Sequence, residues 1–161
     1  MTTDRAVDDK IRIGDRTLTV ASKHAVNASP NELGGIVLGW WEGEHTVVGH
    51  ELVPVPDEHA GRAHYERRWA RAQQILDDYL RRCDDPRLGY MGEWHSHPVP
   101  QPPSSIDRAE LRAVTRQFHR PVALVVISLT SEGDVIPHGL ICRPRWPLRT
   151  AIRPAPIERA S

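Results

Sequence analysis

The segment that most constrains the fold of this chain is residues 88–119, where a strand, a short stiff loop and a helix follow one another. Residues 88–95 have the composition of a strand, and residues 105–119 carry apolar side chains at helical spacing. Between them, residues 98–103 contain four prolines, each of which fixes φ and stiffens the backbone. The end of the strand and the start of the helix are therefore expected to lie close together.

Two histidines and an aspartate border this loop, namely His95, His97 and Asp107. Side chains alternate along a strand, so both imidazoles are expected to point to the same face. Asp107 falls in the first turn of the predicted helix. Two imidazoles and one carboxylate form a three-ligand set for zinc, whose fourth position is left to water in catalytic sites. The sequence therefore predicts a catalytic zinc site, which is typical of a metal-dependent hydrolase.

Each part of this pattern also has a structural explanation. The chain contains nine histidines, so a His-x-His pair alone is a weak signal. The sequence Ser104-x-x-Asp107 has the form of a capping box at a helix N-terminus, and Ser104 can cap the helix while its hydroxyl faces the site. Paired histidines, a rigid loop and an acid in the following turn favour the metal site only in combination.

A hydrolase of this kind also needs a carboxylate that takes a proton from the attacking water. Glu93 lies two residues before His95 and shares its face of the strand, so local geometry slightly favours it. Its alternative role is to orient a ligand histidine through a hydrogen bond. Glu32 lies far upstream, just before an apolar run, and its alternative role is that of a solvated loop residue.

The rest of the chain predicts an α/β domain with a mixed β-sheet flanked by helices. Apolar residues at steps of three and four predict a long amphipathic helix over 64–83. The other expected elements are a short helix at 22–28 and strands at 11–20, 35–41, 46–55, 122–129 and 135–142. Residues 1–9 are expected to form a disordered lead, residues 10–145 the domain, and the Pro- and Arg-rich residues 146–161 a tail without regular structure.

Composition narrows the function classes. Lys plus Arg and Asp plus Glu both number 21, and this neutral balance argues against a broad nucleic-acid or membrane-binding face, although arginines cluster at 62–71 and 143–153. Cys83 and Cys142 lie far apart, which indicates neither a disulfide framework nor a thiolate zinc site. The N-terminus is polar, and the apolar run at 122–127 is too short to span a bilayer. A cytoplasmic protein is expected.

Four separated elements of the chain together resemble one known family. They are Glu32 followed by Gly34-Gly35-Ile36-Val37-Leu38-Gly39, then Gly92-Glu93-Trp94-His95-Ser96-His97-Pro98, then Ser104, then Asp107. In this order they resemble the JAMM metalloproteases, also called JAB or MPN-plus (Mov34/PAD-1), and most closely the small prokaryotic type. The resemblance covers residues 10–145.

The resemblance implies a cytidine-deaminase-like α/β fold and one catalytic Zn²⁺ held by His95, His97 and Asp107. It implies that Glu32, rather than Glu93, is the general base, and that Ser104 donates a hydrogen bond to the oxyanion. The implied activity is hydrolysis of a peptide or isopeptide bond after the C-terminal tail of a ubiquitin-like protein, in deconjugation or precursor processing. Prokaryotic members with these motifs occur beside E1- and E2-like ligases, some in antiphage operons, so a ubiquitin-like protein or its conjugate is the implied partner.

The chain departs from the family pattern in one place. The stretch between His97 and Ser104 is one residue shorter than in eukaryotic members, and the chain has little room for the insertions with which those members grip ubiquitin. The identity of the modifier is therefore left open, and a sulfur-carrier adduct or a modifier precursor are alternative substrates. A non-catalytic MPN-type scaffold or ubiquitin-like-binding module is the alternative function, although every expected ligand position is filled. An amidohydrolase barrel needs about 250 residues, more than this chain has.

Overall fold

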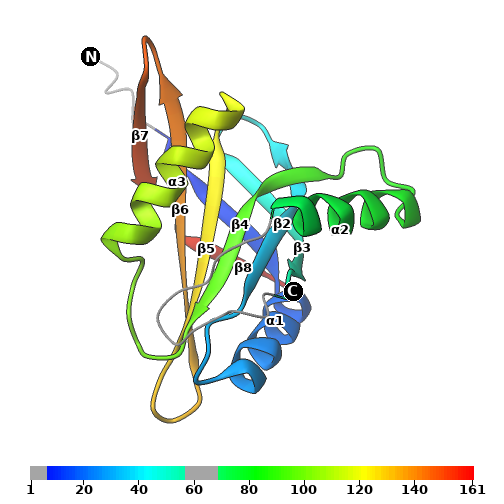
Figure 1. The fold of residues 1–161 in the computed structure, drawn as a ribbon, viewed down its shortest axis with the longest axis vertical. Helices are drawn as coiled ribbons and strands as arrows, with labels where there is room; N and C mark the ends of the chain where they lie inside the picture. The colour runs from blue at the N-terminus through cyan, green and yellow to red at the C-terminus, as the bar shows by residue number, and fades with distance from the viewer. Residues whose placement is uncertain (1–6, 57–68) are drawn as a thin grey trace.

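The computed structural model describes residues 7–56 and 69–161, and its centre is one mixed β-sheet. The strand order is β7-β6-β5-β4-β2-β3-β1-β8. The strands are β1 (Lys10–Gly14), β2 (Gly34–Glu42), β3 (Thr46–Pro54), β4 (Gly89–His97), β5 (Val122–Leu129), β6 (Val135–Arg145), β7 (Arg149–Pro154) and β8 (Ile157–Ala160). The helices in the described residues are α1 (Asp15–Ala28), α2 (Trp69–Arg82) and α3 (Ser105–Phe118). The predicted α/β class with helices flanking a mixed sheet is confirmed (Figure 1).

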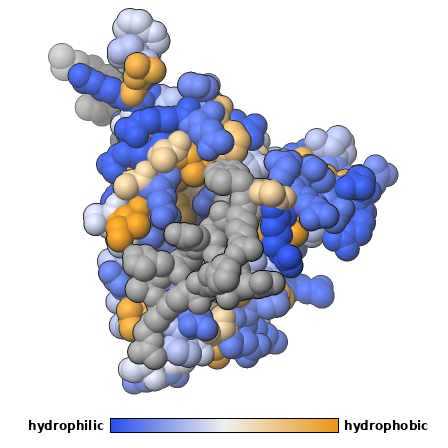
Figure 2. All heavy atoms as spheres, in the orientation of Figure 1, coloured by the Kyte–Doolittle hydropathy of each residue, from blue (hydrophilic) through white to orange (hydrophobic). Residues whose placement is uncertain are grey.

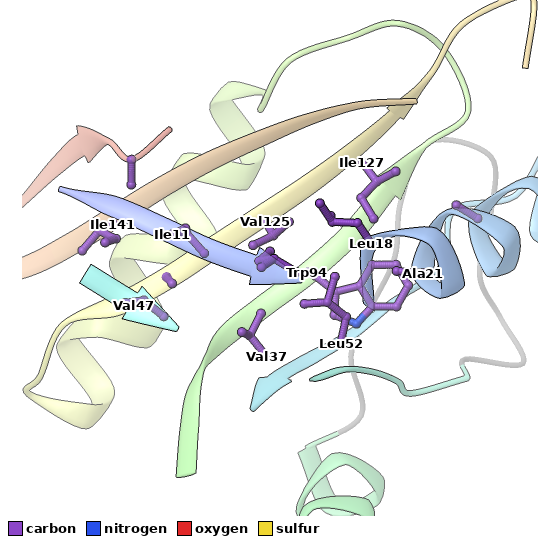
Figure 3. Packing of buried hydrophobic residues seen from close by; sticks show 14 of the residues in the cluster. Ile11, Leu18, Ala21, Val37, Val47, Leu52, Trp94, Val125, Ile127 and Ile141 are labelled. Carbon is purple, nitrogen blue, oxygen red and sulfur yellow. The ribbon is translucent and has the colours of Figure 1, made fainter. Parts of the chain in front are cut away.

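Helices cover both faces of the sheet. Leu18, Ala21 and Ala25 of α1 pack against one face, together with the buried Trp94 of β4 (Figure 3). On the other face, α3 packs through Leu111 against β5 and β6, and α2 packs against β2 and β3. Every residue of β5 is buried, as expected of a strand covered on both sides.

The segment from β4 to β5 is a parallel βαβ unit. β4 pairs in parallel with β5, and α3 forms the crossover between them. On its other side β4 pairs with β2 in antiparallel register, with Gly34 opposite His95. Ligands of open α/β sheets bind outside the carboxyl ends of parallel strands, and β4 ends at the two motif histidines.

The predicted strand over 11–20 is wrong beyond Gly14, because a helix begins at Asp15 and continues to Ala28. The predicted helix over 22–28 is only its second half. The stretch contains several β-branched residues, which favour strands locally. Leu18, Ala21 and Ala25 are nonetheless spaced by three and four and are buried against the sheet, so packing of this face decides the structure.

The other predicted elements agree with the structure more closely. The hairpin at 35–41 and 46–55, the strands at 88–95, 122–129 and 135–142 and the helix at 105–119 all form, with small shifts of their ends. Of the helix predicted over 64–83, α2 accounts for 69–82, and residues 64–68 lie outside the described residues.

The segment after residue 145 is not a loose tail, and this prediction is wrong. β7 pairs with β6, and β8 pairs in parallel with β1 at the opposite edge of the sheet. Ala155, which links the two strands, is fully buried and donates its N–H to the carbonyl of Gly139. Strand pairing and this buried link explain why the prolines and arginines do not prevent regular structure.

The predicted disordered lead at 1–9 is described only from residue 7. Asp9 is buried there and accepts hydrogen bonds from Arg143 at 2.8 Å and pairs with His45 at 2.9 Å. Burial acts to raise the pKa of Asp9, but these two partners outweigh it and hold the pKa below its ordinary value. The chain is thus tied to the sheet before β1 begins.

The surface that Figure 2 shows is mostly hydrophilic over α2 and α3, as expected for helices with one face on a core. None of the helices in the part of the chain that the structure describes has the length and apolar character needed to cross a membrane.

Close packing of β4 against β5 gives a test of the fold at Gly92. A Cβ added at Gly92 would lie 1.9 Å from the carbonyl oxygen of Ala123, whereas one added at Gly89 of the same strand would meet only the Met91 side chain at 3.7 Å. We expect Gly92→Ala to lower the free energy of unfolding by about 3 kcal/mol or more, and Gly89→Ala to change it by less than about 1 kcal/mol. Urea unfolding of both variants measures this, and equal stabilities would contradict the β4–β5 register.

Candidate metal centre

Three side chains from β4 and α3 converge at the carboxyl end of β4. Nε2 of His95 lies 3.2 Å from Nε2 of His97 and 3.1 Å from Oδ1 of Asp107. Nε2 of His97 lies 3.3 Å from Oδ2 of Asp107. The structure therefore brings together the three residues that the sequence singles out as metal ligands.

Local structure explains this convergence. His95 and His97 are two residues apart on β4 and so share one face, while Trp94, directly before His95, points to the α1 side. Ser104 caps α3: its Oγ accepts from the N–H of Asp107 at 3.1 Å, and its own N–H donates to Oδ2 of Asp107 at 2.6 Å. The capping box expected as the structural alternative is present, and it also aims the carboxylate of Asp107 at the imidazoles.

Burial and charge favour a cation between these groups. The side chains of His95 and Asp107 are each 11% exposed, and that of His97 is 5% exposed. Burial acts to raise the pKa of Asp107, but its hydrogen bonds with His95 and His97 outweigh burial and hold the pKa well below the usual range. Burial acts to lower the pKa of His97, yet the bonds to Asp107 and to the Gln101 carbonyl raise it. An ionised carboxylate thus faces two imidazoles in a nearly dry site.

The donor atoms lie close enough together to bind one metal ion. Bonds of about 2.0–2.1 Å in a tetrahedron place neighbouring ligand atoms about 3.3 Å apart. The two Nε2 atoms lie 3.2 Å apart, and each faces a different oxygen of Asp107, Oδ1 at 3.1 Å from His95 and Oδ2 at 3.3 Å from His97. Nδ1 of His97 lies 2.9 Å from the carbonyl oxygen of Gln101, which assigns the ring proton to Nδ1 and directs the lone pair of Nε2 into the triad. Two imidazoles and a carboxylate suit zinc and similar divalent transition metals, and they leave one tetrahedral position open.

Glu32 is held beside the end of β4 by the backbone that follows it. The N–H of Ser96 donates to the carbonyl of Leu33 at 2.7 Å, and the N–H of Leu33 donates to Oγ of Ser96 at 2.9 Å. Glu32 itself is 8% exposed. Its negative charge opposes the effect of burial on His97 and, together with Asp107 and the Gln101 carbonyl, acts to raise the pKa of that imidazole.

Glu93 lies on the same face of β4 as His95 but further from the end of the strand. Oε1 of Glu93 accepts a hydrogen bond from the Tyr90 hydroxyl at 3.2 Å. Glu93, His95, Asp107 and Glu110 line part of a small cavity of about 20 Å³ under α3, which is room for one water molecule. Of the two glutamates that the sequence weighs as bases, Glu93 thus lines the cavity under α3, and Glu32 precedes the backbone that pairs with Ser96.

Three groups around the triad were not singled out from the sequence. They are the backbone carbonyl of Gln101, the hydroxyl of Ser128 on β5, and the carboxyl group of Glu110, whose pKa burial raises. Glu110 follows Asp107 by one helical turn, so helical spacing could have indicated it. A backbone carbonyl carries no side-chain signal, and Ser128 comes near the triad only through strand pairing.

Comparison with known proteins gives one family. Residues 15–137 match the family model described as prokaryotic homologs of the JAB domain. The fold is also similar to that of a Desulfitobacterium hafniense protein solved in solution, with a TM-score of 0.70, 19% identity, and coverage of 94% of this chain and 93% of that one.

Three curated relatives are each named CD-NTase/cGAS isopeptidase. The Pseudomonas aeruginosa protein is 29% identical over 141 residues, which are 76% of this chain and 81% of that protein. The Escherichia coli protein is 36% identical over 77 residues, which are 47% of this chain and 49% of the relative. The Vibrio cholerae protein is 33% identical over 82 residues, which are 50% of this chain and 52% of that protein. The match thus spans about half the length of the E. coli and V. cholerae relatives.

The donor spacing predicts that a divalent metal stabilises the folded chain. We expect added Zn²⁺ to raise the thermal unfolding midpoint, because an ion that binds only the folded state shifts the equilibrium towards it. His97→Ala should abolish this rise, whereas His24→Ala, on the exposed side of α1, should keep it. Calorimetry with and without a chelator measures both, and an identical response of the two variants would argue against the triad as the binding site.

Proposed function

This chain belongs to the prokaryotic homologs of the JAB domain, and from this membership we propose that it is a zinc-dependent isopeptidase. The observation that carries the proposal is the set of His95, His97 and Asp107, whose nearly buried ligand atoms converge closely enough to hold one metal ion. A binding module or scaffold needs no such set, and this favours a hydrolase over the non-catalytic alternative.

The relatives support the kind of bond and the kind of substrate. All three carry the name CD-NTase/cGAS isopeptidase, which supports an isopeptide bond as the substrate and a CD-NTase system as its setting. We therefore assign to this chain the hydrolysis of an isopeptide bond between a protein C-terminus and a lysine amine, in a ubiquitin-like conjugate of a CD-NTase system. Such conjugates need enzymes that form them, so the proposal includes E1- and E2-like ligases as the source of the substrate and antiphage defence in the cytoplasm as its setting.

The chemistry that a zinc ion supplies in such a site is polarisation of the scissile carbonyl and a lowered pKa, to about 7, of a coordinated water. His95, His97 and Asp107 would hold the ion. The bond from Nδ1 of His97 to the Gln101 carbonyl and the capping box around Asp107 keep these ligand atoms aimed at one point. The near-complete burial of the triad excludes bulk water, which strengthens each electrostatic interaction there.

Glu32 is the general base in this proposal. It takes a proton from the attacking water, whose oxygen bonds to the carbonyl carbon, and it gives the proton to the amine nitrogen as the C–N bond breaks. Its support is its near-complete burial and the pairing of the next residue, Leu33, with Ser96 between the two histidines of β4. Glu93 lies further inside, with its carboxylate engaged by Tyr90.

Ser104 stabilises the negative charge that develops on the carbonyl oxygen. Its Oγ accepts the N–H of Asp107, and this bond leaves the hydroxyl hydrogen available to donate. The side chain sits at the N-terminus of α3, where the helix dipole also favours negative charge.

Replacing each of the two glutamates by glutamine in turn tests which one is the general base. We expect Glu32→Gln to keep the metal and to lower kcat by about 10²–10⁴-fold, because the amide cannot take up the proton. Glu93→Gln is the matched control and should retain most activity. The assay is cleavage of an isopeptide-linked conjugate from a CD-NTase system, with zinc content measured in parallel. Loss of activity in Glu93→Gln alone would make Glu93 the base instead.

Removal of the Ser104 hydroxyl tests the oxyanion donor. Ser104→Ala should lower kcat by about 10²–10³-fold with zinc still bound. Because the hydroxyl also caps α3, the variant is expected to lose about 1 kcal/mol of stability, and Ser104→Gly separates the two effects, since glycine is a tolerated cap without a hydroxyl. Unchanged kcat in both variants would remove Ser104 from the mechanism.

A further inference from the structure

The carbonyl of Gln101 accepts two hydrogen bonds at the edge of the metal centre. One is from Nδ1 of His97, at 2.9 Å. The other is from the hydroxyl of Ser128. A carbonyl oxygen has two lone pairs, so these two donors satisfy it fully.

Ser128 reaches this carbonyl from the neighbouring strand. It is the residue of β5 that pairs with His97 of β4, and it is fully buried. Alternate residues of β5 at Leu124 and Val126 pack under α3, so Ser128 continues the face on which the triad lies. A buried hydroxyl on an otherwise apolar strand is costly unless it is bonded, and its partner here is the loop that follows the metal motif.

Few backbone N–H groups are available to anchor the loop at 98–103 by hydrogen bonds. Its prolines at 98, 100, 102 and 103 lack the N–H through which a backbone is usually tied to its surroundings. The N–H of Gln101 turns back onto the carbonyl of Val99 at 2.7 Å. The bond from Ser128 therefore connects the Gln101 carbonyl directly to the rigid centre of the sheet.

The position of that carbonyl decides which nitrogen of His97 is available as a ligand. A neutral imidazole carries its proton on one nitrogen only, and a bond from Nδ1–H to a carbonyl leaves Nε2 as the lone-pair donor. Nε2 of His97 is the atom that faces Asp107 and His95. A carbonyl free to move would loosen both the tautomer and the orientation of the ring.

We propose that Ser128 is a positioning residue of the metal centre, which acts through the Gln101 carbonyl to orient His97 for the ion. The inference rests on the proposed function, since it concerns the ion that the triad holds there. Groups that orient ligand histidines in this way typically contribute 10- to 100-fold in metal affinity, and we expect about that loss of Zn²⁺ affinity in Ser128→Ala.

The test is competition for Zn²⁺ between the 161-residue chain and a chromophoric chelator. Ser128→Thr and Ser128→Val form a matched pair of equal volume, in which threonine keeps the hydroxyl and valine lacks it. We expect threonine to bind Zn²⁺ more tightly than valine, and the visible spectrum of bound Co²⁺ to change in the valine and alanine variants. Thr115→Val is the control elsewhere, because it removes another fully buried hydroxyl, bonded to the Leu111 carbonyl at 2.8 Å.

The outcomes separate this inference from the proposed function. Zn²⁺ affinity within about twofold of the unmodified chain in Ser128→Ala and Ser128→Val would overturn the inference and leave the isopeptidase proposal intact. An equal loss in Thr115→Val would also overturn it, since the effect would then be general loosening. Loss of affinity confined to the Ser128 variants, in a chain that hydrolyses no conjugate, would support the inference and count against the proposed function. Absence of Zn²⁺ binding by the unmodified chain would overturn both.

Discussion

The site depends on the register of β4, and the burial of Trp94 sets that register. The indole is 1% exposed, packs with Leu18 and Ala21 of α1, and donates from Nε1 to the Val53 carbonyl at 3.2 Å (Figure 3). Because side chains alternate along a strand, the residues on either side of Trp94 must face α3. A slip of one residue would place the imidazoles in the apolar core under α1 and turn the indole to the face of the triad. The packing of one aromatic side chain therefore decides where the two histidines meet Asp107.

The neighbours of β4 each bring a different group to its end. Antiparallel pairing with β2 places Glu32 there, and parallel pairing with β5 places Ser128. The crossover helix α3 contributes Asp107 from its first turn. These residues are far apart in the chain and near one another only because β4 is central to the sheet. The arrangement requires one antiparallel and one parallel neighbour of β4. If both neighbours ran in the same sense, Glu32, Ser128 and Asp107 would not all lie at the carboxyl end of β4.

Local patterns made part of this arrangement predictable. The histidines of β4 and the Ser104-x-x-Asp107 cap lie within one strand–loop–helix segment, so their convergence follows from alternation, loop length and helix geometry. The first half of α1 could not be read in this way, because the β-branched Thr17, Thr19 and Val20 obscure a helical face that matters only against the finished sheet. β7 and β8 likewise depend on distant partners, β6 and β1. Ser128 and the Gln101 carbonyl were missed because one needs strand register and the other is backbone.

The capping box of α3 has a consequence for the orientation of Asp107. Ser104 holds the Asp107 carboxylate through hydrogen bonds within the first turn of the helix. Small zinc modules often need the ion in order to fold at all. In this chain the direction of the carboxylate follows from the bonds that start α3, so helix initiation and the aim of this side chain have one structural cause.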